Sequence, residues 1–395
     1  MAVRILHSIH DVAATEWNAL GLGGQPFLRH EFLAALEDTG CATDDTGWIP
    51  QHLLLLDDRT QALRGAMPLY LKTHSFGEFV FDFNWAQAYD QAYLRAGLSY
   101  YPKLVSAVPF TPATGPRLLI APEMDTPTVA KELLDALEAL AAEKQISSAH
   151  VLFPDPDSVA QLTRQGWLSR VSCQFHWFNR GYRSMEDFLM EFRADKRKKA
   201  KRERRRVEEQ GIGFKTLSGA DLTQQQWHTV FHFSANTFHE HGNEHYLNAE
   251  FFYRVAQALP HQVMVKLAEH QGKPVAAAIF FVSDDTLFGR YWGALDNFHS
   301  LHFETCYYQG IDYCITHGLQ RFEPGTQGEH KVPRGFEPTL AHSAHYLSEP
   351  RFRHALADYL QRERSAVADY ADEMRMHVPF HRHIQQPEAS TPPTL

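Results

Sequence analysis

The spacing of hydrophobic and polar residues predicts alternating strands and helices along the chain. Helical periodicity is clearest at residues 127–144, where Val129, Leu133 and Leu137 fall on one face. Short apolar runs on either side of turn residues predict hairpins at 51–72 and 263–282. By the same criteria we expect strands at 3–9, 79–83, 104–108, 118–120, 287–295 and 341–347, and helices at 12–20, 30–38, 85–98, 184–209, 223–240, 249–259, 303–317 and from 351 onward. This order predicts an α/β fold with mixed sheets.

The second half of the chain repeats the plan of the first half. In each half a hairpin is followed by a strand, a tyrosine-containing helix and a segment rich in proline and glycine, which reads SAVPFTPATGPR first and RFEPGTQGEHKVPRGF later. A period of about 200 residues indicates a duplicated domain and argues against a solenoid of short repeats. We therefore expect two domains, residues 1–172 and 173–383, followed by a disordered proline-rich tail at 384–395.

Length and composition are those of a folded globular protein. The chain has 395 residues, of which 44% are hydrophobic and 22% charged, and this excludes a disordered or disulfide-stapled chain. Its longest apolar runs, 53–56 and 275–282, are too short for a membrane helix, and the first residues lack the pattern of a signal peptide. The four cysteines form no Cys-x-x-Cys pair, so we expect reduced thiols and a cytoplasmic location.

Charge is distributed very unevenly along the sequence. The chain has a net charge of −9, yet residues 193–206 contain ten Lys or Arg against two acidic residues. Such a helix either binds a phosphate-bearing partner or is a solvated surface helix with Glu203, Glu208 and Glu209 as its ion-pair partners. The candidates for phosphate or nucleic-acid binding are Arg193, Lys196, Arg197, Lys199, Lys201 and Arg205.

Several segments together resemble a known family. They are YYPKLVSAVPFTPATGPR, FLMEFRADKRKKAKRERRRVEEQGI, YLNAEFF, GRYWG, HFETCYYQGIDYCI and, most specifically, FEPGTQGEHKVPRGFEP. The combination is similar to the bacterial FemAB-like predicted N-acyltransferases of the peptidoglycan biosynthesis or recognition type, over about residues 5–380. The resemblance implies tandem GNAT-like domains, as in the FemABX branch, which takes amino acids from aminoacyl-tRNA to peptidoglycan precursors. It thereby makes tRNA the expected partner of the basic helix.

One segment departs from the GNAT pattern. GNAT enzymes that use acetyl-CoA carry a glycine-rich loop between a core strand and a helix, because backbone N–H groups must approach the pyrophosphate there. The corresponding segment in this chain, ALDNFHSLHF, contains no glycine. Arg290-Tyr-Trp-Gly293-Ala294 lies within an expected strand and has different spacing. The sequence therefore favours an aminoacyl-tRNA donor over acyl-CoA.

The segment FEPGTQGEHKVPRGF concentrates ionisable side chains between turn residues. Acyl transfer to an amine needs a base for the ammonium proton and donors for the oxyanion, and Glu323 or His330 is the candidate base. Gln327, Lys331 and Arg334 are candidates for binding substrate, the last two through a carboxylate or phosphate. The alternative is an exposed polar loop without a chemical role.

Further candidates come from spacing and position. Glu304 and Tyr308 share a helix face and are expected to point at the same cavity as Glu323, although Tyr308 also suits a core position. The spacing in HEHGNEH does not suit zinc, so its histidines are expected to line a cleft, and neither a metal nor a tightly bound cofactor is expected. Lys103, Thr111 and Arg117 either meet substrate or stabilise a structural turn. The remaining substrate-binding candidates are His239, His241 and Tyr291.

These observations favour an N-acyltransferase that transfers an acyl or aminoacyl group to an amine. Motifs for a covalent nucleophile are absent from the sequence, so direct attack of the amine within a ternary complex is expected. Two alternatives stay open: an acetyl- or acyl-CoA-dependent N-acetyltransferase, and a non-catalytic module that binds RNA or a cell-wall precursor.

Overall fold

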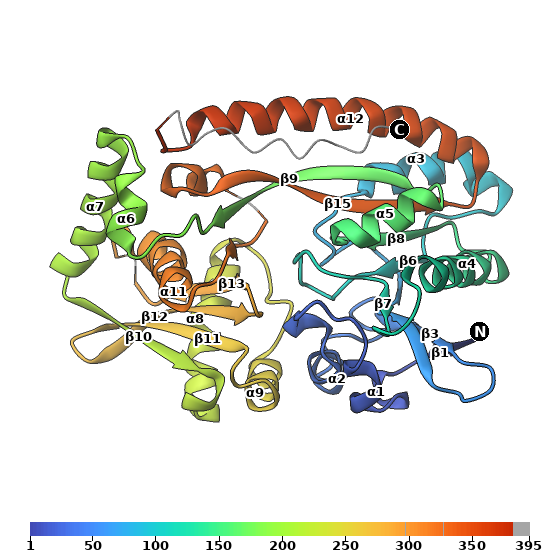
Figure 1. Cartoon of the computed structure of the whole chain (residues 1–395), viewed down its shortest axis with the longest axis horizontal. Coiled ribbons are helices and arrows are strands. Elements are labelled where there is room, and N and C mark those ends of the chain that lie inside the picture. The colour runs from blue at the N-terminus through green and yellow to red at the C-terminus, as the bar shows by residue number, and fades with distance from the viewer. Residues whose placement is uncertain (297, 327, 382–395) are drawn as a thin grey trace. The chain divides into compact units, whose positions relative to one another are not determined.

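The computed structural model describes residues 1–296, 298–326 and 328–381, which form two compact units (Figure 1). The first unit comprises residues 1–172, 245–260 and 340–367, and the second comprises 173–244, 261–339 and the chain from 368. The units therefore differ from the expected consecutive domains, because two later segments return to the first unit. Gln327 and the expected tail at 384–395 lie outside the described residues.

Apolar packing explains why residues 245–260 belong to the first unit. Helix α9 (Ala249–Ala258) is capped by Asn248, whose side chain accepts from the Phe251 amide and donates to the Thr39 carbonyl. The Phe251 ring packs edge-on against Phe32 of α2 (His30–Asp38) at 5.3 Å. The amphipathic pattern correctly predicts this helix, but a periodic pattern does not specify which core the apolar face joins.

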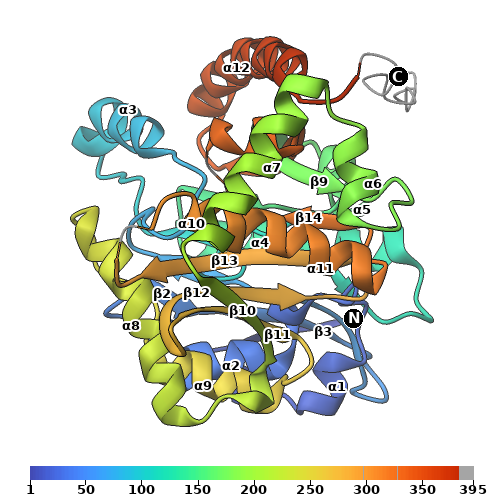
Figure 2. The same cartoon turned by 90° about the vertical axis from the view of Figure 1, so that its left-hand side faces the viewer.

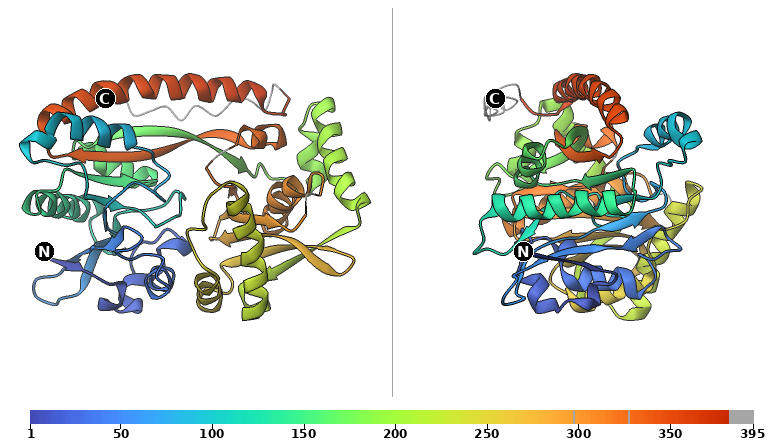
Figure 3. Two further views of the ribbon diagram at one scale, coloured as in Figure 1. Left: turned by 180° about the vertical axis from the view of Figure 1, so that it is seen from behind. Right: turned by 90° about the vertical axis from the view of Figure 1, so that its right-hand side faces the viewer.

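The first unit consists of two sheets and the helices that cover them. Its elements are β1 (Ala2–Leu6), α1 (Ala14–Asn18), α2, β2 (Trp48–Pro50), β3 (His52–Leu56), β4 (Leu63–Met67), β5 (Tyr70–Lys72), α3 (Phe83–Tyr93), β6 (Lys103–Ser106), β7 (Leu119–Ile120), α4 (Thr126–Glu143), β8 (Ser148–Leu152), α5 (Pro156–Arg164), α9 and parts of β9 (Leu168–Phe178), β15 (Glu337–Leu347) and α12 (Pro350–His377). One sheet has the order β1-β3-β4-β7, and the other contains β15-β8-β6-β5-β2. Helix α4 packs its apolar face, including Val129 and Leu133, against β3, β4 and β8 (Figure 3).

The second unit is organised around an antiparallel meander. Its elements are α6 (Met185–Met190), α7 (Ala194–Glu209), β10 (Ile212–Ser218), α8 (Gln224–Glu240), β11 (Val263–His270), β12 (Lys273–Val282), β13 (Thr286–Ala294), α10 (Leu301–Phe303), α11 (Gln309–His317), β14 (Arg321–Glu323) and the ends of β9, β15 and α12. Strands β10 to β13 pair antiparallel in sequence order, β13 pairs parallel with β14, and β14 pairs antiparallel with β9 (Figure 2). Side chains alternate along β13, so Gly293 faces α8 and Trp292 faces the region of α10.

Three expected elements differ from the structure. The helix expected at 184–209 is divided at residues 191–193, because Phe192 turns into the core against Phe188 and Phe380. The helix expected at 303–317 contains a five-residue π-helical turn, Glu304–Tyr308. Residues 79–83 form no strand. Within the described part of the chain, no helix has the length and apolar character needed to cross a membrane.

Candidate active site

Strands β13 and β14 separate soon after they begin to pair, and a cavity lies where they separate. Their parallel pairing is limited to Thr286–Phe288 against Arg321–Glu323, after which β13 continues to Ala294 paired with β12 but not with β14. The cavity has a volume of about 150 Å³ and is lined from β13 by Tyr291, from the π-helical turn by Tyr307, and by Pro324 after β14. Tyr291, one of the predicted substrate ligands, therefore lines this cavity, and its contact with substrate stays a prediction.

The turn at Glu329–Arg334 places His330, which is exposed to solvent, against Tyr307 in the wall of this cavity. The His330 Nε2 atom is 2.7 Å from the Tyr307 hydroxyl. Gly328 has φ +111°, and a Cβ atom at this position would lie 2.1 Å from His330 Cε1, so only glycine lets the imidazole adopt this position. Burial, followed by the charges of Lys331 and Arg334, lowers the pKa of His330. The imidazole is therefore neutral near pH 7 and able to accept a proton.

Lys331 is almost fully buried beside this histidine. Its Nζ atom donates to the Gly325 carbonyl at 2.8 Å, across the turn that follows β14. Burial lowers the pKa of Lys331 to about 7, so the amine is charged in only part of the molecules at neutral pH. Lys331 is not among the residues that line the cavity, and its contact with Gly325 holds the shape of the turn.

Arg334 is engaged by groups of its own unit. Its guanidinium donates to Glu203 of α7 through Nε at 3.1 Å and Nη2 at 2.8 Å, and Nη1 donates to the His330 carbonyl. The group also lies 3.4 Å from the centre of the Phe303 ring. Each guanidinium nitrogen thus has an acceptor, and this arrangement favours positioning of the His330 turn over the predicted contact with a substrate anion.

The π-helical turn directs Glu304 and Tyr308 away from the cavity. Glu304 forms an ion pair with Arg204 at 3.2 Å, and the Tyr308 hydroxyl donates to Glu203 at 2.9 Å, so both side chains contact α7. Neither residue is among those lining the cavity, whereas the neighbouring Tyr307 is. The expectation that Glu304 and Tyr308 share the cavity with Glu323 is therefore wrong. Side chains of a π-helical turn point in different directions from those of an α-helix. The α-helical spacing on which the expectation rested therefore does not apply here.

Glu323, the other candidate base, lies at the end of β14. Its side chain is 4% exposed, and its Oε1 atom is 3.4 Å from Arg321 Nε. The adjacent Pro324 lines the cavity, but Glu323 itself does not. The geometry therefore favours His330 over Glu323 as the proton acceptor.

Helix α7 presents many of its cations to solvent. Among the predicted phosphate ligands, Lys201 pairs with Glu186 and Arg205 with Glu209, while Lys196 lies 3.9 Å from Asp195. Arg193 and Arg197 donate to the carbonyls of Val378 and Met190, respectively. Four exposed cations of α7 have no ion-pair partner in the described part of the chain; they are the predicted Lys199 together with Lys198, Arg202 and Arg206, the last of which contacts His299 Nε2 at 3.4 Å. Of the carboxylates expected to neutralise the helix, Glu209 does so and Glu203 is instead buried against Arg334.

The remaining predicted ligands are not at this cavity. His239 and His241 are exposed near the end of α8, where His241 Nδ1 contacts the Thr237 carbonyl at 2.7 Å. In the first unit Thr111 is buried and donates to the Pro109 carbonyl. Arg117, 1% exposed, donates to four backbone carbonyls, and Lys103 is buried among carboxylates. For these three buried residues the structural alternative holds, because their polar atoms stabilise the unit itself.

A comparison with known proteins places the chain in a family. The family model for FemAB-like proteins of peptidoglycan biosynthesis/recognition matches residues 8–382. The chain belongs to the FemAB-like family. The match to the crystal structure of FemX covers 90% of this FemAB-like chain and 100% of the FemX chain, with a TM-score of 0.52 at 10% identity. This likeness confirms the predicted fold, which is consistent with duplicated GNAT-like domains. Membership of the family supports an acyltransferase.

Other solved structures show weaker likeness to this FemAB-like protein. L-PGS from Bacillus licheniformis covers 84% of the chain and 96% of its own, with a TM-score of 0.48 at 10% identity. The match to a tandem GNAT protein from the clavulanic acid biosynthesis pathway covers 88% of this chain and 99% of that protein, with a TM-score of 0.44 at 9% identity. No curated protein sequence matches the chain.

Proposed function

We propose that this FemAB-like protein transfers an aminoacyl group from aminoacyl-tRNA to an amine of a peptidoglycan precursor, at the cavity beside β13. The observation that carries the proposal is the contact between Tyr307, which lines the cavity, and the neutral imidazole of His330. A base that reaches a cavity through a phenol is suited to removing a proton from an amine.

The pair supports a balanced proton path. The Tyr307 hydroxyl donates its proton to His330 Nε2 while the phenol oxygen accepts a proton from the acceptor ammonium. The neutral amine nitrogen then attacks the carbonyl carbon of the aminoacyl ester, a C–N bond forms, and the ester C–O bond breaks. The departing ribose oxygen takes the proton back from the imidazolium through Tyr307. The nitrogen of the new amide then releases its second proton to His330 by the same path, and the imidazolium returns this proton to solvent. Burial raises the pKa of Tyr307, so the phenol stays protonated and acts as a relay between two neutral states.

Two features support aminoacyl-tRNA rather than acyl-CoA as the donor. Residues 295–300, which connect β13 to α10, contain no glycine to approach a pyrophosphate. A Cβ atom on Gly293 would lie 1.8 Å from the Phe233 carbonyl oxygen, so this glycine serves the packing of α8 on β13. Helix α7 offers the exposed cations Lys198, Lys199 and Arg202 for the phosphates of an RNA.

A transfer assay tests both the chemistry and the donor. Purified protein is incubated with an amine-bearing peptidoglycan precursor and either a mixture of aminoacyl-tRNAs or acetyl-CoA. We expect transfer from aminoacyl-tRNA only, and His330→Gln is expected to lower kcat by about 10²–10⁴ with little change in KM. The matched control is His228→Gln, at an exposed position on α8, which should leave kcat unchanged.

The contribution of tRNA binding is tested with a variant in which Lys198, Lys199 and Arg202 are replaced by alanine. Loss of three phosphate contacts should make the slope of log affinity for tRNA against log salt about 2–3 shallower. A control variant with Lys144, Lys273 and Arg351 replaced by alanine removes equal charge at exposed positions elsewhere. Unchanged kcat in His330→Gln refutes the proposed base, and transfer from acetyl-CoA alone identifies an acyl-CoA-dependent N-acetyltransferase instead. Binding of tRNA without transfer from either donor indicates a binding module.

A further inference from the structure

The segment between β5 and α3 exposes its aromatic side chains and buries its polar ones. Residues 75–83 read SFGEFVFDF, and the structure buries Ser75, Glu78 and Asp82. Phe76, Phe81 and Phe83 are 65%, 58% and 39% exposed, respectively. A soluble loop ordinarily has the opposite arrangement, because burying apolar side chains is favourable and burying charges is costly.

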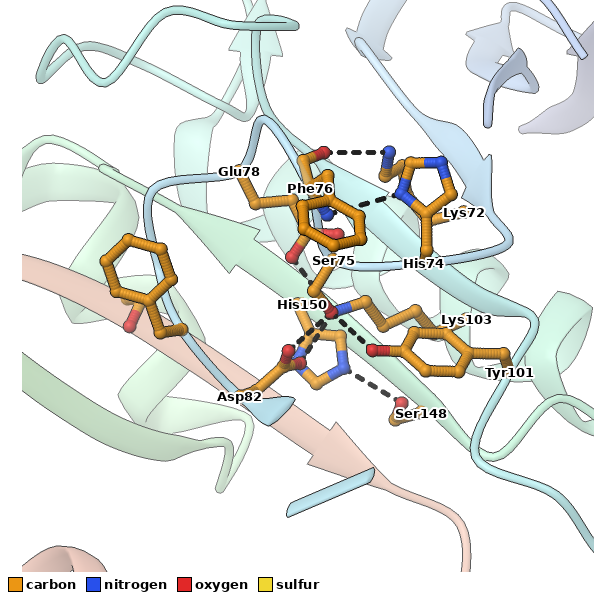
Figure 4. Close-up of polar contacts among 12 residues, drawn as sticks. Lys72, His74, Ser75, Phe76, Glu78, Asp82, Tyr101, Lys103, Ser148 and His150 are labelled. Carbon is orange, nitrogen blue, oxygen red and sulfur yellow. Dashed lines mark hydrogen bonds and ion pairs between the residues drawn. The ribbon is translucent and has the colours of Figure 1, made fainter. Parts of the chain in front are cut away.

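An ionic cluster beneath the segment maintains this arrangement (Figure 4). The Nζ atom of Lys103 donates to Ser75 Oγ at 2.7 Å, to Glu78 Oε2 at 2.8 Å and to Asp82 Oδ2 at 2.5 Å. The Tyr100 hydroxyl also donates to Asp82, at 2.7 Å. One buried ammonium thereby fixes three points of the segment and fills the space that the phenyl rings would otherwise occupy.

Two further basic side chains bind the backbone of the same segment. Lys72 Nζ donates to the Phe76 carbonyl at 3.3 Å, and Arg170 Nη1 donates to the Phe81 carbonyl at 2.8 Å. Both accepting carbonyls belong to exposed phenylalanines. The rings are therefore presented by a fixed backbone, and little conformational entropy remains to be lost when they meet an apolar partner.

The exposed rings form one continuous apolar patch. The Phe83 ring lies 5.4 Å from Phe76 and stacks with Phe81 at 6.2 Å. After α3, which stands out from the sheets of its own unit (Figures 2 and 3), Leu94 and Leu98 are also exposed. A patch of this kind on a folded protein marks an interaction site.

The charges around the patch indicate its partner. Residues 73–98, all of which the structure describes, contain three carboxylates; Glu78 and Asp82 are buried and Asp90 is half-buried, where it accepts from the Tyr100 amide. Arg95 is the exposed cation of this stretch. Exposed phenylalanines, leucines and an arginine within one stretch that exposes no carboxylate match the boundary between anionic headgroups and acyl chains.

We propose that Phe76, Phe81 and Phe83, together with Leu94, Leu98 and Arg95, form a docking surface for a lipid bilayer that contains anionic lipids. The three rings enter the acyl-chain boundary, and Arg95 meets the headgroups. The docking surface is independent of the transfer chemistry proposed above, because it lies in the first unit and uses no residue of the cavity.

Sedimentation with vesicles tests this docking surface. Wild-type protein is mixed with vesicles of phosphatidylcholine and phosphatidylglycerol, and the bound fraction is measured against lipid concentration. Burial of each phenylalanine contributes about tenfold to partitioning, so F76S/F81S/F83S should weaken binding by more than a hundredfold. The control V3S/L295S/M376S removes exposed apolar side chains elsewhere and should bind like the wild type.

A second measurement does not depend on the triple variant folding. The Phe81→Trp variant places an exposed indole on the docking surface, and vesicles with brominated acyl chains should quench its fluorescence in excess of that of wild-type protein. The absence of vesicle binding by wild type, equal binding by F76S/F81S/F83S, or the absence of excess quenching would overturn the proposal. Self-association of the wild type that is abolished in F76S/F81S/F83S, without vesicle binding, would assign the surface to a second copy of the chain and also overturn it.

Discussion

Replacing Glu78 with glutamine tests which of the two carboxyl groups beside Lys103 holds a proton. Asp82 accepts from Ser75, Tyr100 and Lys103, whereas Glu78 accepts from Lys103 alone. The Oε1 atom of Glu78 is buried and has no hydrogen-bond partner in the described part of the chain. The ammonium therefore stabilises the charge of Asp82 more effectively than that of Glu78.

The pKa values of the two carboxyl groups reflect this difference in stabilisation. Burial raises the pKa of Asp82, but Lys103 and the other polar neighbours outweigh it and lower the value to about 2. Burial raises the pKa of Glu78 from 4.5 to about 7, and Lys103 only partly offsets the effect. The change for Glu78 corresponds to about 3 kcal/mol of differential stability.

The sign of the effect follows from proton binding. Between pH 4.5 and about 7, folded Glu78 retains a proton that the unfolded chain has released. Its contribution to the free energy of unfolding is therefore complete below pH 4.5 and is lost as pH rises through 7. Glutamine does not titrate, so the free energy of unfolding of wild type minus that of Glu78→Gln should fall by about 3 kcal/mol between pH 4.5 and pH 8.

Urea denaturation at several pH values between 4.5 and 8 measures this difference. Buried groups that titrate in this range without interacting with Glu78, such as His245, are present in both proteins and cancel in the comparison. Lys72, which has a pKa of about 7 and interacts with Glu78, contributes to the measured difference. The exposed substitution Glu143→Gln serves as a control and should show no pH-dependent difference. A difference for Glu78→Gln that stays constant within about 1 kcal/mol, or that rises with pH, would show that Glu78 is ionised and that the reasoning is wrong.

Two predictions concern the packing of the second unit. Gly293→Ala should lower the free energy of unfolding by about 1–3 kcal/mol in urea titrations, because its Cβ would lie 1.8 Å from a carbonyl oxygen of α8. The control is Gly213→Ala, where a Cβ meets nothing within 4 Å. Equal losses of stability in the two variants would contradict this account. Glu203→Ala should cost about 3–5 kcal/mol in the same titration, because it leaves Arg334 buried without its carboxylate. The exposed Glu208→Ala on the same helix should cost little, and a small loss for Glu203→Ala would mean that water replaces the carboxylate.

Elements with strong periodicity were predictable from the sequence. The helix expected at 30–38 is α2 (His30–Asp38), and the helix expected at 223–240 begins one residue later, after its capping residue Thr223. The division between α6 and α7 was not predictable, since Phe192 continues the apolar stripe of α6 but packs against Phe380, far along the chain. A contact between distant residues leaves no trace in local periodicity.

The candidate site was predictable in part, for a similar reason. The density of ionisable residues between glycines and prolines drew attention to the turn that contains His330, which contacts the cavity residue Tyr307. Tyr307 was missed as a cavity residue, because helical spacing grouped Tyr308 with Glu304 and nothing in the sequence signals a π-helical turn. For Lys103 the sequence left substrate contact and a structural turn open, since a lysine buried among carboxylates cannot be distinguished from an exposed one by sequence.

The segment SFGEFVFDF shows how the same pattern predicts two different structures. Alternation of aromatic and polar residues is typical of a strand with one buried face, and a strand was expected at 79–83. The alternation instead separates side chains that Lys103 draws inward from rings that remain outside. Only the position of Lys103, which follows the segment by about 20 residues, distinguishes the two cases.

The discontinuous first unit has a consequence for how the protein is made. The apolar cluster of Trp85, Tyr89 and Tyr100 is completed by Leu347 and Leu356, which are translated some 250 residues later. A chain emerging from the ribosome cannot close this part of its N-terminal unit until β15 and the start of α12 have left the exit tunnel. The amino-terminal half must therefore wait, incompletely folded, through the synthesis of nearly the whole second unit, a period in which chaperones have access to its apolar surfaces.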